Sequence, residues 1–510
     1  MPEPWWKRAV VYQIYPRSFA DASGDGVGDL EGIRRRLDHL QWLGVDAIWI
    51  SPFFRSPMAD FGYDVSDYCD VDPLFGTLED FDRLLAEAHG RDIRVLIDWV
   101  PNHTSDQHPW FLEARASRDN LKRDWYVWVD GTPDRPPNNW KAAFGKGAPA
   151  WTWDEATGQW YLHLFLPEQP DLNWRNPEIV DAMHETLRFW LDRGVDGFRM
   201  DVIHALAKDP AFPDADDPWL GTERFDEHTT HELIRGFRRL VDSYAGERVS
   251  VGEVFILSTK KVAEYYGKGD ELHLAFNFPP LFAPWDAGKW RKRIDRVVEE
   301  FDPVGAWPTW VLSNHDNPRH RSRYGGSEAK ARAAAVLLLT LRGTPFLYQG
   351  EELGLLDADV PPERQVDPGG RDGGRAPIPW DATARHGWGT EDPWLPWPPE
   401  PDVRNVETER ADPTSVLHLY RRLLAARQKS EALQVGSWAP LPSPAGVLAY
   451  ERVAGDDQRA VLVNYTDESL NAAVEDEWDV EVSSDGTLEG EHYNGALAAN
   501  QALLLRPAAS

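Results

Sequence analysis

The 510-residue chain carries 54 Lys and Arg against 84 Asp and Glu, which gives a formal net charge of −30 at pH 7. Because such a chain repels phosphate backbones, nucleic acid is excluded as an expected partner. No apolar run reaches the roughly 18 residues of a membrane helix, and the opening MPEPWWKRAV lacks the hydrophobic core of a secretory signal. We therefore expect a soluble, cytoplasmic protein with no membrane partner.

Cysteine and tryptophan usage adds two constraints. The single cysteine, Cys69, excludes an internal disulfide and a cysteine-rich metal cluster, as is typical of a reducing compartment. The chain has an unusually large number of Trp residues, 25 in all. Their aromatic faces suit ligands that have an apolar face of their own, such as sugar rings. Any one of these Trp side chains can equally well fill the core.

Short apolar, β-branched runs recur along the chain with helical patterns between them. Residues 30–44 repeat their apolar positions every three or four residues, and a helix over 176–194 begins with Pro177 and ends at Gly194. Alternation of this kind predicts βαβ units, and eight strands close a (β/α)8 barrel. The eight expected strands are at 10–16, 47–52, 94–100, 197–202, 249–254, 274–278, 309–316 and 344–350.

Two irregular stretches and one change of pattern divide the chain further. Residues 104–173 predict a small subdomain inserted after the third strand, and residues 355–411 predict a long loop after the eighth strand. From 435 onward, alternating strands follow one another without helices, which predicts an antiparallel β domain. The expected organisation is a barrel at 1–103 and 174–434, the insertion at 104–173 and the β domain at 435–510.

Four acidic residues lie within or just after apolar strands: Asp98, Asp201, Glu253 and Asp316. The carboxyl ends of barrel strands converge on one rim, so these side chains are expected to meet there. Converging carboxylates indicate either a metal site or paired acid and base chemistry. Because a catalytic metal site usually brings several His ligands and this rim offers few, the paired carboxylates are favoured.

Arg199 stands two residues before Asp201, on the same face of its strand. A guanidinium there is expected to lower the pKa of Asp201 and keep it ionised as a nucleophile. Glu253 has no adjacent cation in the sequence and is expected to have a raised pKa, suited to a proton donor. This division is typical of retaining glycosidases, in which the two carboxyl groups lie roughly 5 Å apart.

At this point the chain resembles the α-amylase superfamily of glycoside hydrolases, and within it the α-glucosidase and oligo-1,6-glucosidase branch. The resemblance covers essentially the whole chain and rests on DWVPNH at 98–103, QPDLN at 169–173, GFRMD at 197–201, Glu253 in VGEV, and NHD at 314–316. It implies Asp201 as nucleophile, Glu253 as general acid/base and Asp316 as the third carboxylate, which holds and distorts the sugar. The substrate-binding residues that it implies are Tyr63, Asp64, His103, Phe144, Phe165, Arg199, His315 and Arg375, the last within GRDGGRAPIPWD where the commoner motif is RTPMQWD.

The segment DASGDGVGD at 21–29 places oxygen-bearing side chains at alternate positions. Hard cations prefer such oxygen ligands, and the segment resembles the calcium loop of this branch, with Ser23 in place of the usual Asn. A structural calcium ion is therefore expected, and an acidic, glycine-rich turn without an ion is the alternative. The expected ligands are Asp21, Ser23, Asp25, the Val27 carbonyl and Asp29.

The sequence thus predicts a retaining exo-α-glucosidase, with no organic cofactor, acting on small α-glucosides of the maltose, isomaltose and sucrose class. The enzyme is expected to be a monomer or homodimer, and glucosyl transfer could accompany hydrolysis. A glucosyl-transferring or isomerising relative, of the sucrose isomerase or trehalose synthase type, is the first alternative, and a non-catalytic barrel relative is the second. Val202 resembles the residue of α-1,6-preferring members, although Ile203-His204-Ala205 resembles a group that cleaves α-1,4 links.

Overall fold

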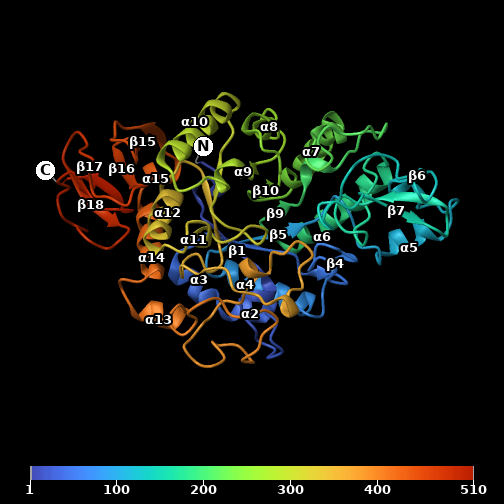
Figure 1. The fold of residues 1–510 in the computed structure, drawn as a ribbon, viewed down its shortest axis with the longest axis horizontal. Coiled ribbons are helices and arrows are strands. Elements are labelled where there is room, and N and C mark those ends of the chain that lie inside the picture. Colours follow the sequence, from blue (N-terminus) through green and yellow to red (C-terminus); the bar gives the residue numbers. More distant parts are fainter. Residues whose placement is uncertain (1–2, 509–510) are drawn as a thin grey trace.

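The computed structural model describes residues 3–508, with a barrel of eight parallel strands at its centre (Figure 1). The strand order is β11-β10-β9-β5-β2-β1-β13-β12, and every pairing in this sheet is parallel. The predicted (β/α)8 fold is therefore confirmed. The strands are β1 (Val11–Ile14), β2 (Ala47–Ile50), β5 (Arg94–Trp99), β9 (Gly197–Met200), β10 (Val249–Gly252), β11 (Leu274–Ala275), β12 (Thr309–Val311) and β13 (Thr344–Tyr348).

The barrel strands read as continuous apolar runs because both of their faces are buried. Ala47 and Val251 belong to the cluster that fills the barrel, whereas Ile48 belongs to the large cluster between the strands and the surrounding helices. The ladder is closed between β11 and β12 by a side chain, since the Thr309 hydroxyl donates to the Ala275 carbonyl at 2.8 Å. Inward-facing positions at the carboxyl ends of the strands are polar, and these positions form the site.

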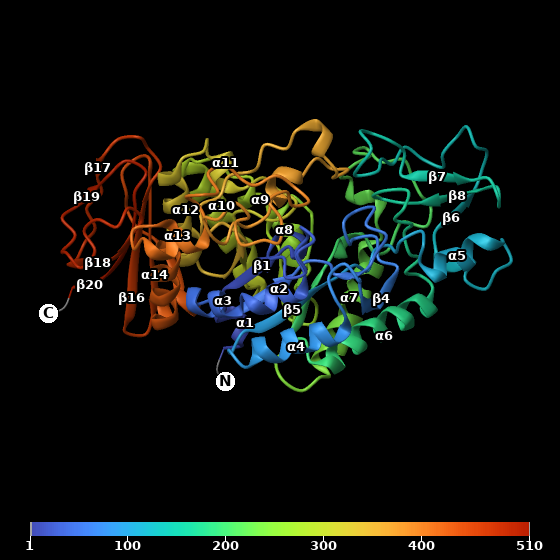
Figure 2. The same ribbon diagram turned by 90° about the horizontal axis from the view of Figure 1, so that it is seen from below.

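The helices around the barrel follow the sequence pattern with one exception. The helix expected over 30–44 is two helices, α2 (Leu30–Arg35) and α3 (Leu37–Leu43), because Arg36 leaves helical geometry and places its guanidinium 4.1 Å from the centre of the Trp380 ring. Figure 2 shows the outer helices along the barrel wall. They include α4 (Leu78–His89), α6 (Pro177–Arg193), α7 (Glu227–Asp242), α8 (Thr259–Glu264), α9 (Phe278–Leu281), α10 (Ala287–Phe301), α11 (His320–Arg323), α12 (Glu328–Thr340) and α14 (Val416–Lys429), with α1 (Trp5–Arg8) before β1 and α15 (Glu431–Val435) directly after α14.

The segment between β5 and α6 forms a three-stranded antiparallel sheet of its own, in the order β6-β8-β7, at one end of the molecule (Figure 1). A second antiparallel sheet, in the order β14-β15-β16-β20-β18, lies at the opposite end and contains the C-terminal strands. The structure thus has separate sheets where the insertion and the β domain are expected, while the domain boundaries stay predictions. The elements are α5 (Pro109–Ala116), β6 (Trp128–Asp130), β7 (Trp151–Asp154), β8 (Gln159–Leu162), β14 (Ser437–Pro440), β15 (Val447–Ala454), β16 (Asp457–Asn464), β18 (Trp478–Ser483) and β20 (Ala502–Pro507), with β17 (Leu470–Asn471) paired to β19 (Ala496–Leu497) and β3 (Phe54–Arg55) to β4 (Asp67–Val71).

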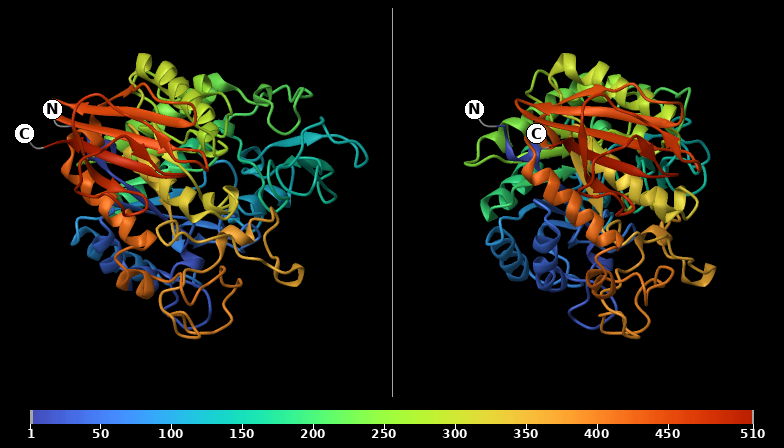
Figure 3. Two further views of the ribbon diagram at one scale, coloured as in Figure 1. Left: turned by 60° about the vertical axis from the view of Figure 1, so that its left-hand side comes forward. Right: turned by 90° about the vertical axis from the view of Figure 1, so that its left-hand side faces the viewer.

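The long segment 355–411 contains one regular α-helix, α13 (Val406–Ala411), and otherwise wraps over the barrel (Figure 3). It reaches the first loop of the chain, where the Gly389 amide donates to the Asp21 carboxylate at 3.1 Å. Within residues 3–508, no helix has both the length and the apolar composition needed to cross a bilayer.

Candidate active site

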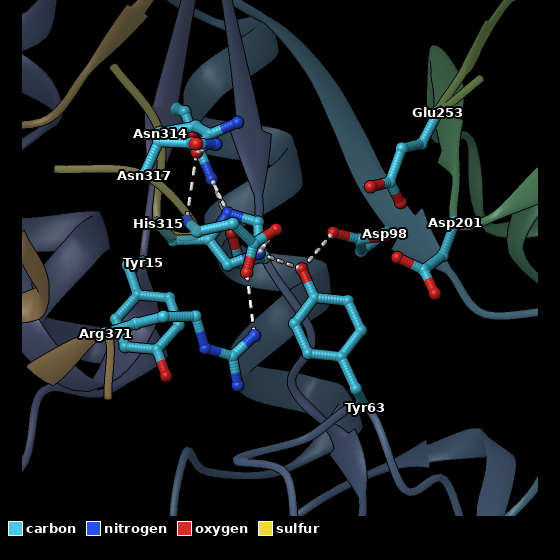
Figure 4. Close-up of polar contacts among 12 residues, drawn as sticks. Tyr15, Tyr63, Asp98, Asp201, Glu253, Asn314, His315, Asn317 and Arg371 are labelled. Carbon is cyan, nitrogen blue, oxygen red and sulfur yellow. Dashed lines mark hydrogen bonds and ion pairs between the residues drawn. The ribbon is translucent and has the colours of Figure 1, made fainter. Parts of the chain in front are cut away.

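The structure brings the predicted strand-end carboxylates together at the carboxyl end of the barrel (Figure 4). Asp98 lies on β5, Asp201 follows β9 and Glu253 follows β10, and these three strands are neighbours in the sheet. The β5 and β9 register places Asp98 opposite Arg199, which points into the barrel beside the acids. Asp316 follows β12 on the far side of the same opening.

Arg199 contacts all three of the carboxyl groups on its side of the site. Its Nη1 lies 2.9 Å from Asp98 and also contacts Asp201, and its Nη2 lies 2.7 Å from Glu253. The expectation that Glu253 lacks an adjacent cation is therefore wrong. The contact comes from the neighbouring strand β9, where a pattern read along β10 alone cannot detect it.

The electrostatics of this cluster also differ from the simple expectation. Burial raises the pKa of Asp201 well above its usual value, and Glu253 and Asp98 add to that rise against the opposing effect of Arg199. Burial likewise raises the pKa of Asp98 to about 6. One guanidinium does not balance three carboxyl groups, of which Asp98 and Asp201 are buried, so the cluster retains a proton more readily than an isolated pair of acids would.

The backbone after β9 turns sharply so that an amide points at Glu253. Val202 has a φ of +44°, a conformation that is unfavourable for a β-branched residue, and its N–H donates to the Glu253 carboxylate at 3.1 Å. The Asp201 amide donates to the Trp99 carbonyl at 2.9 Å, and the Glu253 amide donates to the Met200 carbonyl at 2.8 Å. These bonds hold both acids on rigid strand ends, and strain of this kind is typical of functional sites.

A stacked pair of rings connects Asp98 to the opposite wall. The rings of Tyr63 and His315 lie 5.4 Å apart with an interplanar angle of 4°. The Gln13 amide donates to Nδ1 of His315 at 2.7 Å, which leaves Nε2 as the protonated nitrogen, in contact with the Tyr63 hydroxyl. That hydroxyl donates to Asp98 at 3.1 Å, and burial lowers the pKa of His315 to about 3. His315 is therefore a neutral donor held in one orientation.

Asp316 is surrounded by donors and stays ionised. Arg371 Nη1 contacts its carboxylate at 2.8 Å, and Arg375 Nη2 approaches the same oxygen at 3.3 Å. Burial raises the pKa of Asp316, yet the guanidinium groups of Arg371 and Arg375 beside its carboxylate hold that pKa well below its usual range. A carboxylate held in this way can accept hydrogen bonds from ligand hydroxyl groups.

Two residues of the sequence motifs that were not singled out, Asp60 and Arg371, line the pocket. Asp60 lines the pocket and pairs with Arg371 at 2.7 Å, whereas Asp64 is fully buried and accepts hydrogen bonds from Ser56 and from two amides of its own loop. Arg371 faces the pocket, whereas Arg375 lies behind it and donates to the His315 carbonyl at 2.8 Å. The sequence contains both pairs of candidates, since DFGYD holds two acidic residues and GRDGGR holds two arginines. The position in the motif alone does not show which residue of each pair faces the pocket.

These groups enclose a pocket of about 390 Å³, within the range of small-molecule sites. His103, Phe144 and Phe165 line it, and burial lowers the pKa of His103 to about 4. Arg199, His315 and Arg375 stand behind the lining residues and position them. The lining includes Asp60, Tyr63, His103, Phe144, Phe165, Asp201, Val202, Ala205, Trp219, Leu220, Phe225, Glu253, Phe255, Asp316 and Arg371.

The loop at 21–29 is closed by its own amides. Asp21 accepts from the Gly24 amide at 2.6 Å and from the Gly26 amide at 3.0 Å, and Asp29 caps α2 through the Gly32 amide at 2.6 Å. Among the described residues, no three His, Cys, Asp or Glu side chains converge as a metal site requires. No chemistry is assigned to calcium, and the ion stays a prediction, with Asp21, Ser23, Asp25, the Val27 carbonyl and Asp29 as its expected ligands.

Comparison with known proteins agrees with this geometry. The model of the alpha amylase catalytic domain matches residues 13–436. The chain belongs to the alpha-amylase family. It is 44% identical over 508 residues to a probable alpha-glucosidase of Rhizobium meliloti, covering 91% of this chain and 90% of that protein. It is 37% identical over 520 residues to an oligo-1,6-glucosidase of Parageobacillus thermoglucosidasius, covering 92% of each.

The solved structures that resemble this glycoside hydrolase include an alpha-glucosyl transfer enzyme and a trehalulose synthase. The alpha-glucosyl transfer enzyme XgtA superposes with a TM-score of 0.92 at 40% identity, covering 99% of this chain and 100% of that one. An inactive double mutant of MutB in complex with isomaltulose gives a TM-score of 0.92 at 35% identity, again covering 99% of this chain and 100% of that one. Membership of this glycoside hydrolase branch excludes the non-catalytic alternative.

Proposed function

We propose that this glycoside hydrolase is a retaining, exo-acting α-glucosidase that removes terminal non-reducing glucose from short α-glucosides. The observation that carries the proposal is the Arg199 fork, which holds Asp201 on one nitrogen and Glu253 on the other. Two carboxyl groups held by one planar guanidinium are close neighbours. That closeness suits the roughly 5 Å separation of retaining enzymes better than the roughly 6.5 to 9.5 Å of inverting ones, which must admit a water molecule.

In the first step, an Asp201 oxygen attacks the anomeric carbon while Glu253 donates its proton to the glycosidic oxygen. The bond between the anomeric carbon and that oxygen breaks, and the leaving group departs as an alcohol. The shared proton of the carboxyl cluster supplies the acid, and the Val202 amide orients the Glu253 carboxyl group.

The second step reverses these roles. Once Asp201 is esterified, it no longer carries charge, so Arg199 contacts one charged group fewer and keeps its contact with Glu253. Glu253 then accepts a proton from water as the water oxygen attacks the anomeric carbon and displaces Asp201. The product keeps the α configuration because two inversions occur.

Exo action is supported by the ion pairs that close one end of the pocket. Arg371 binds Asp60 at 2.7 Å, Asp316 at 2.8 Å and Asp367 at 2.6 Å. These contacts join the loop after β2 to the segment after β13 across the polar end of the site. A glucan chain could not continue through that wall, so a terminal glucose is the unit that fits.

Activity measurements on single variants test the proposal. Asp201→Asn and Glu253→Gln should each lower turnover of 4-nitrophenyl α-glucoside at least about a thousandfold with unchanged circular dichroism, because the loss of a nucleophile or proton donor raises the barrier by several kcal/mol. The exposed Asp130→Asn serves as a matched control that keeps activity. Asp201→Gly with azide should release a β-glucosyl azide, and near-normal activity of either amide variant would overturn the assignment.

A second function is favoured by the solved neighbours, which include an alpha-glucosyl transfer enzyme and a trehalulose synthase. Both reactions would share the covalent intermediate on Asp201 and differ in the acceptor. Sugar analysis after incubation with maltose, isomaltose and sucrose separates the two. Free glucose as the main product supports hydrolysis, whereas rearranged or elongated sugars support transfer.

A further inference from the structure

A buried lysine joins three of the segments around the pocket. Lys208 is 5% exposed, and it is the only lysine that the fold buries among residues 3–508. It lies on the segment that follows β9, and its ammonium group contacts the Asp171 carboxylate and the Asn102 side-chain oxygen, both at 2.7 Å. Its third contact, with the Leu206 carbonyl, is 3.3 Å long. Since Asn102 follows β5 and Asp171 lies between β8 and α6, one side chain ties these segments together.

Burying an ammonium group costs free energy. Burial lowers the pKa of Lys208, and Asp171 opposes that decrease. The lost hydration of the charge is compensated only where each N–H group finds an acceptor, and Lys208 has three acceptors. Lysine also differs from asparagine and glutamine because it donates hydrogen bonds and never accepts them. Lys208 therefore determines which atom of each neighbour faces it.

The ammonium group sets the orientation of the Asn102 amide. Because lysine only donates, the side-chain oxygen of Asn102 faces Lys208 and the side-chain nitrogen faces away from it. That nitrogen lies 3.2 Å from Asp171 and 3.1 Å from Nδ1 of His103. An amide nitrogen only donates, so Nδ1 of His103 accepts this hydrogen bond and does not carry the ring proton.

The other side of the His103 ring requires the same tautomer. Burial lowers the pKa of His103 to about 4, so the ring is neutral at pH 7. Its Nε2 lies 3.1 Å from the Tyr63 carbonyl, which can only accept, and the ring lines the pocket. Gln169 also lies beside Nε2, and its amide nitrogen donates to Asp60 at 3.2 Å. His103 therefore carries its proton on Nε2, the arrangement that the Gln13 amide imposes on His315.

We propose that Lys208 acts through the Asn102 amide as a positioning residue, which keeps His103 neutral with its proton on Nε2, where it can donate to a hydroxyl group of the bound glucose. The inference rests on the proposed glucosidase activity and adds two residues that lie outside the pocket lining. Without the ammonium group, the Asn102 amide is free to turn. Its oxygen would then face Nδ1 of His103.

Removal of the lysine should change the His103 ring in a definite direction. The charged groups that face the ring are Asp171, which raises its pKa, and Lys208, which lowers it; Asp60 reaches it only through Gln169. In Lys208→Met the carboxylate stays, and the turned amide places an oxygen at Nδ1 while the Tyr63 carbonyl remains at Nε2. Two acceptors favour the doubly protonated ring, so the pKa of His103 should rise.

Histidine NMR and kinetics test the proposal together. In enzyme labelled with [15N]histidine, the ring nitrogens of His103 are identified by their loss in His103→Gln, and their chemical shifts report tautomer and titration. The wild type should show a ring protonated on Nε2, and Lys208→Met should titrate at higher pH. Its kcat/KM for 4-nitrophenyl α-glucoside should fall about tenfold or more, as for the loss of one hydrogen bond. Lys208→Arg, which also only donates, should keep both properties of the wild type.

Three further variants separate the relay from a general effect on folding. Asn102→Leu removes the oxygen that would turn toward the ring, so Lys208→Met should cost less activity in that background than in the wild type. Lys7→Met removes a lysine that pairs with Glu3 at 2.8 Å outside the pocket lining, and should change neither readout. Where Lys208→Met does not fold, Lys208→Gln, which can still donate to Asp171, carries the same expectations.

The outcomes separate this inference from the proposed function. An unshifted titration of His103 in the folded lysine variant would overturn the inference, and equal costs of Lys208→Met with and without Asn102 would overturn the relay through the amide. A shifted titration with unchanged kcat/KM would overturn the role of His103 as a donor to glucose. A wild type that hydrolyses no α-glucoside, but whose His103 shifts in Lys208→Met, would overturn the proposed function and support the relay.

Discussion

Replacement of Arg199 by lysine should slow the enzyme and shift its pH profile. Arg199 is 2% exposed and contacts Asp98, Asp201 and Glu253 with one planar fork. Lysine keeps the positive charge, so the cluster is not left without a cation. The lysine ammonium group, however, is a single charged centre on a flexible side chain. It cannot hold Asp201 and Glu253 on two nitrogens with a fixed separation, as the guanidinium group does.

The magnitude follows from the contacts that are lost. A hydrogen bond to a charged group contributes about 1.5 to 3 kcal/mol, and loss of a donor that stabilises a transition state typically costs about 2.7 to 4 kcal/mol. We therefore expect kcat/KM for 4-nitrophenyl α-glucoside to fall by about two to three powers of ten. Stopped assays at saturating and limiting substrate separate the effect on kcat from that on KM.

The pH dependence carries the more specific prediction. The nucleophile must be ionised, so the low-pH limb of kcat/KM reports the pKa of the carboxyl cluster in the free enzyme. Burial raises the pKa of Asp201, and Arg199 opposes that rise. Weakening the opposing charge raises the pKa further, so the ascending limb should move to higher pH.

Arg94→Lys provides the control, because Arg94 sits at the opposite end of β5 and pairs with Asp196 at 2.9 Å. It should leave both the turnover and the pH profile unchanged. Folding of each variant is checked by circular dichroism. A folded Arg199→Lys enzyme with less than tenfold loss and an unmoved ascending limb would show that Arg199 does not set the ionisation of the cluster.

Three further predictions concern linkage preference, the ion and stability. Val202→Thr should lower the ratio of kcat/KM for isomaltose over maltose, by a factor that corresponds to at most about 1 to 3 kcal/mol, because threonine replaces an apolar methyl group beside Asp201 with a hydroxyl group; a ratio that does not fall would move the selection to other loops. Calcium added after chelation should raise the melting temperature if the loop at 21–29 binds it, whereas equal midpoints would show that its amides alone close the loop. Burial raises the pKa of Glu409 to about 8, above its ordinary 4.5, so this carboxyl group reduces stability as the pH rises through that interval. Glu409→Gln should therefore melt at a higher temperature than the wild type at pH 8 and at nearly the same temperature at pH 5, and an equal difference at both pH values would contradict this.

The barrel and its reactive rim could be predicted from the sequence because both depend on short-range patterns. Apolar runs of a few residues with helices between them require a parallel sheet, and an acid at the end of such a run must emerge at the rim. Arg199 and Asp201, two residues apart, were expected on one face for the same reason. The pattern failed at Arg36, where an aromatic contact with Trp380 from a remote segment interrupts an otherwise regular helix.

The partners of each side chain were decided by tertiary structure. Arg199 contacts Glu253 as well as Asp201 because β9 and β10 are neighbours in the sheet. The sequence of a single strand does not show which strand lies beside it. The position of Asp60 in the pocket lining, with Asp64 fully buried, likewise depends on the path of a loop. Loop paths are set by contacts between distant segments, such as the pairing of Arg371 with Asp60 across 311 residues of chain, whereas periodicity reports only which face of an element is buried.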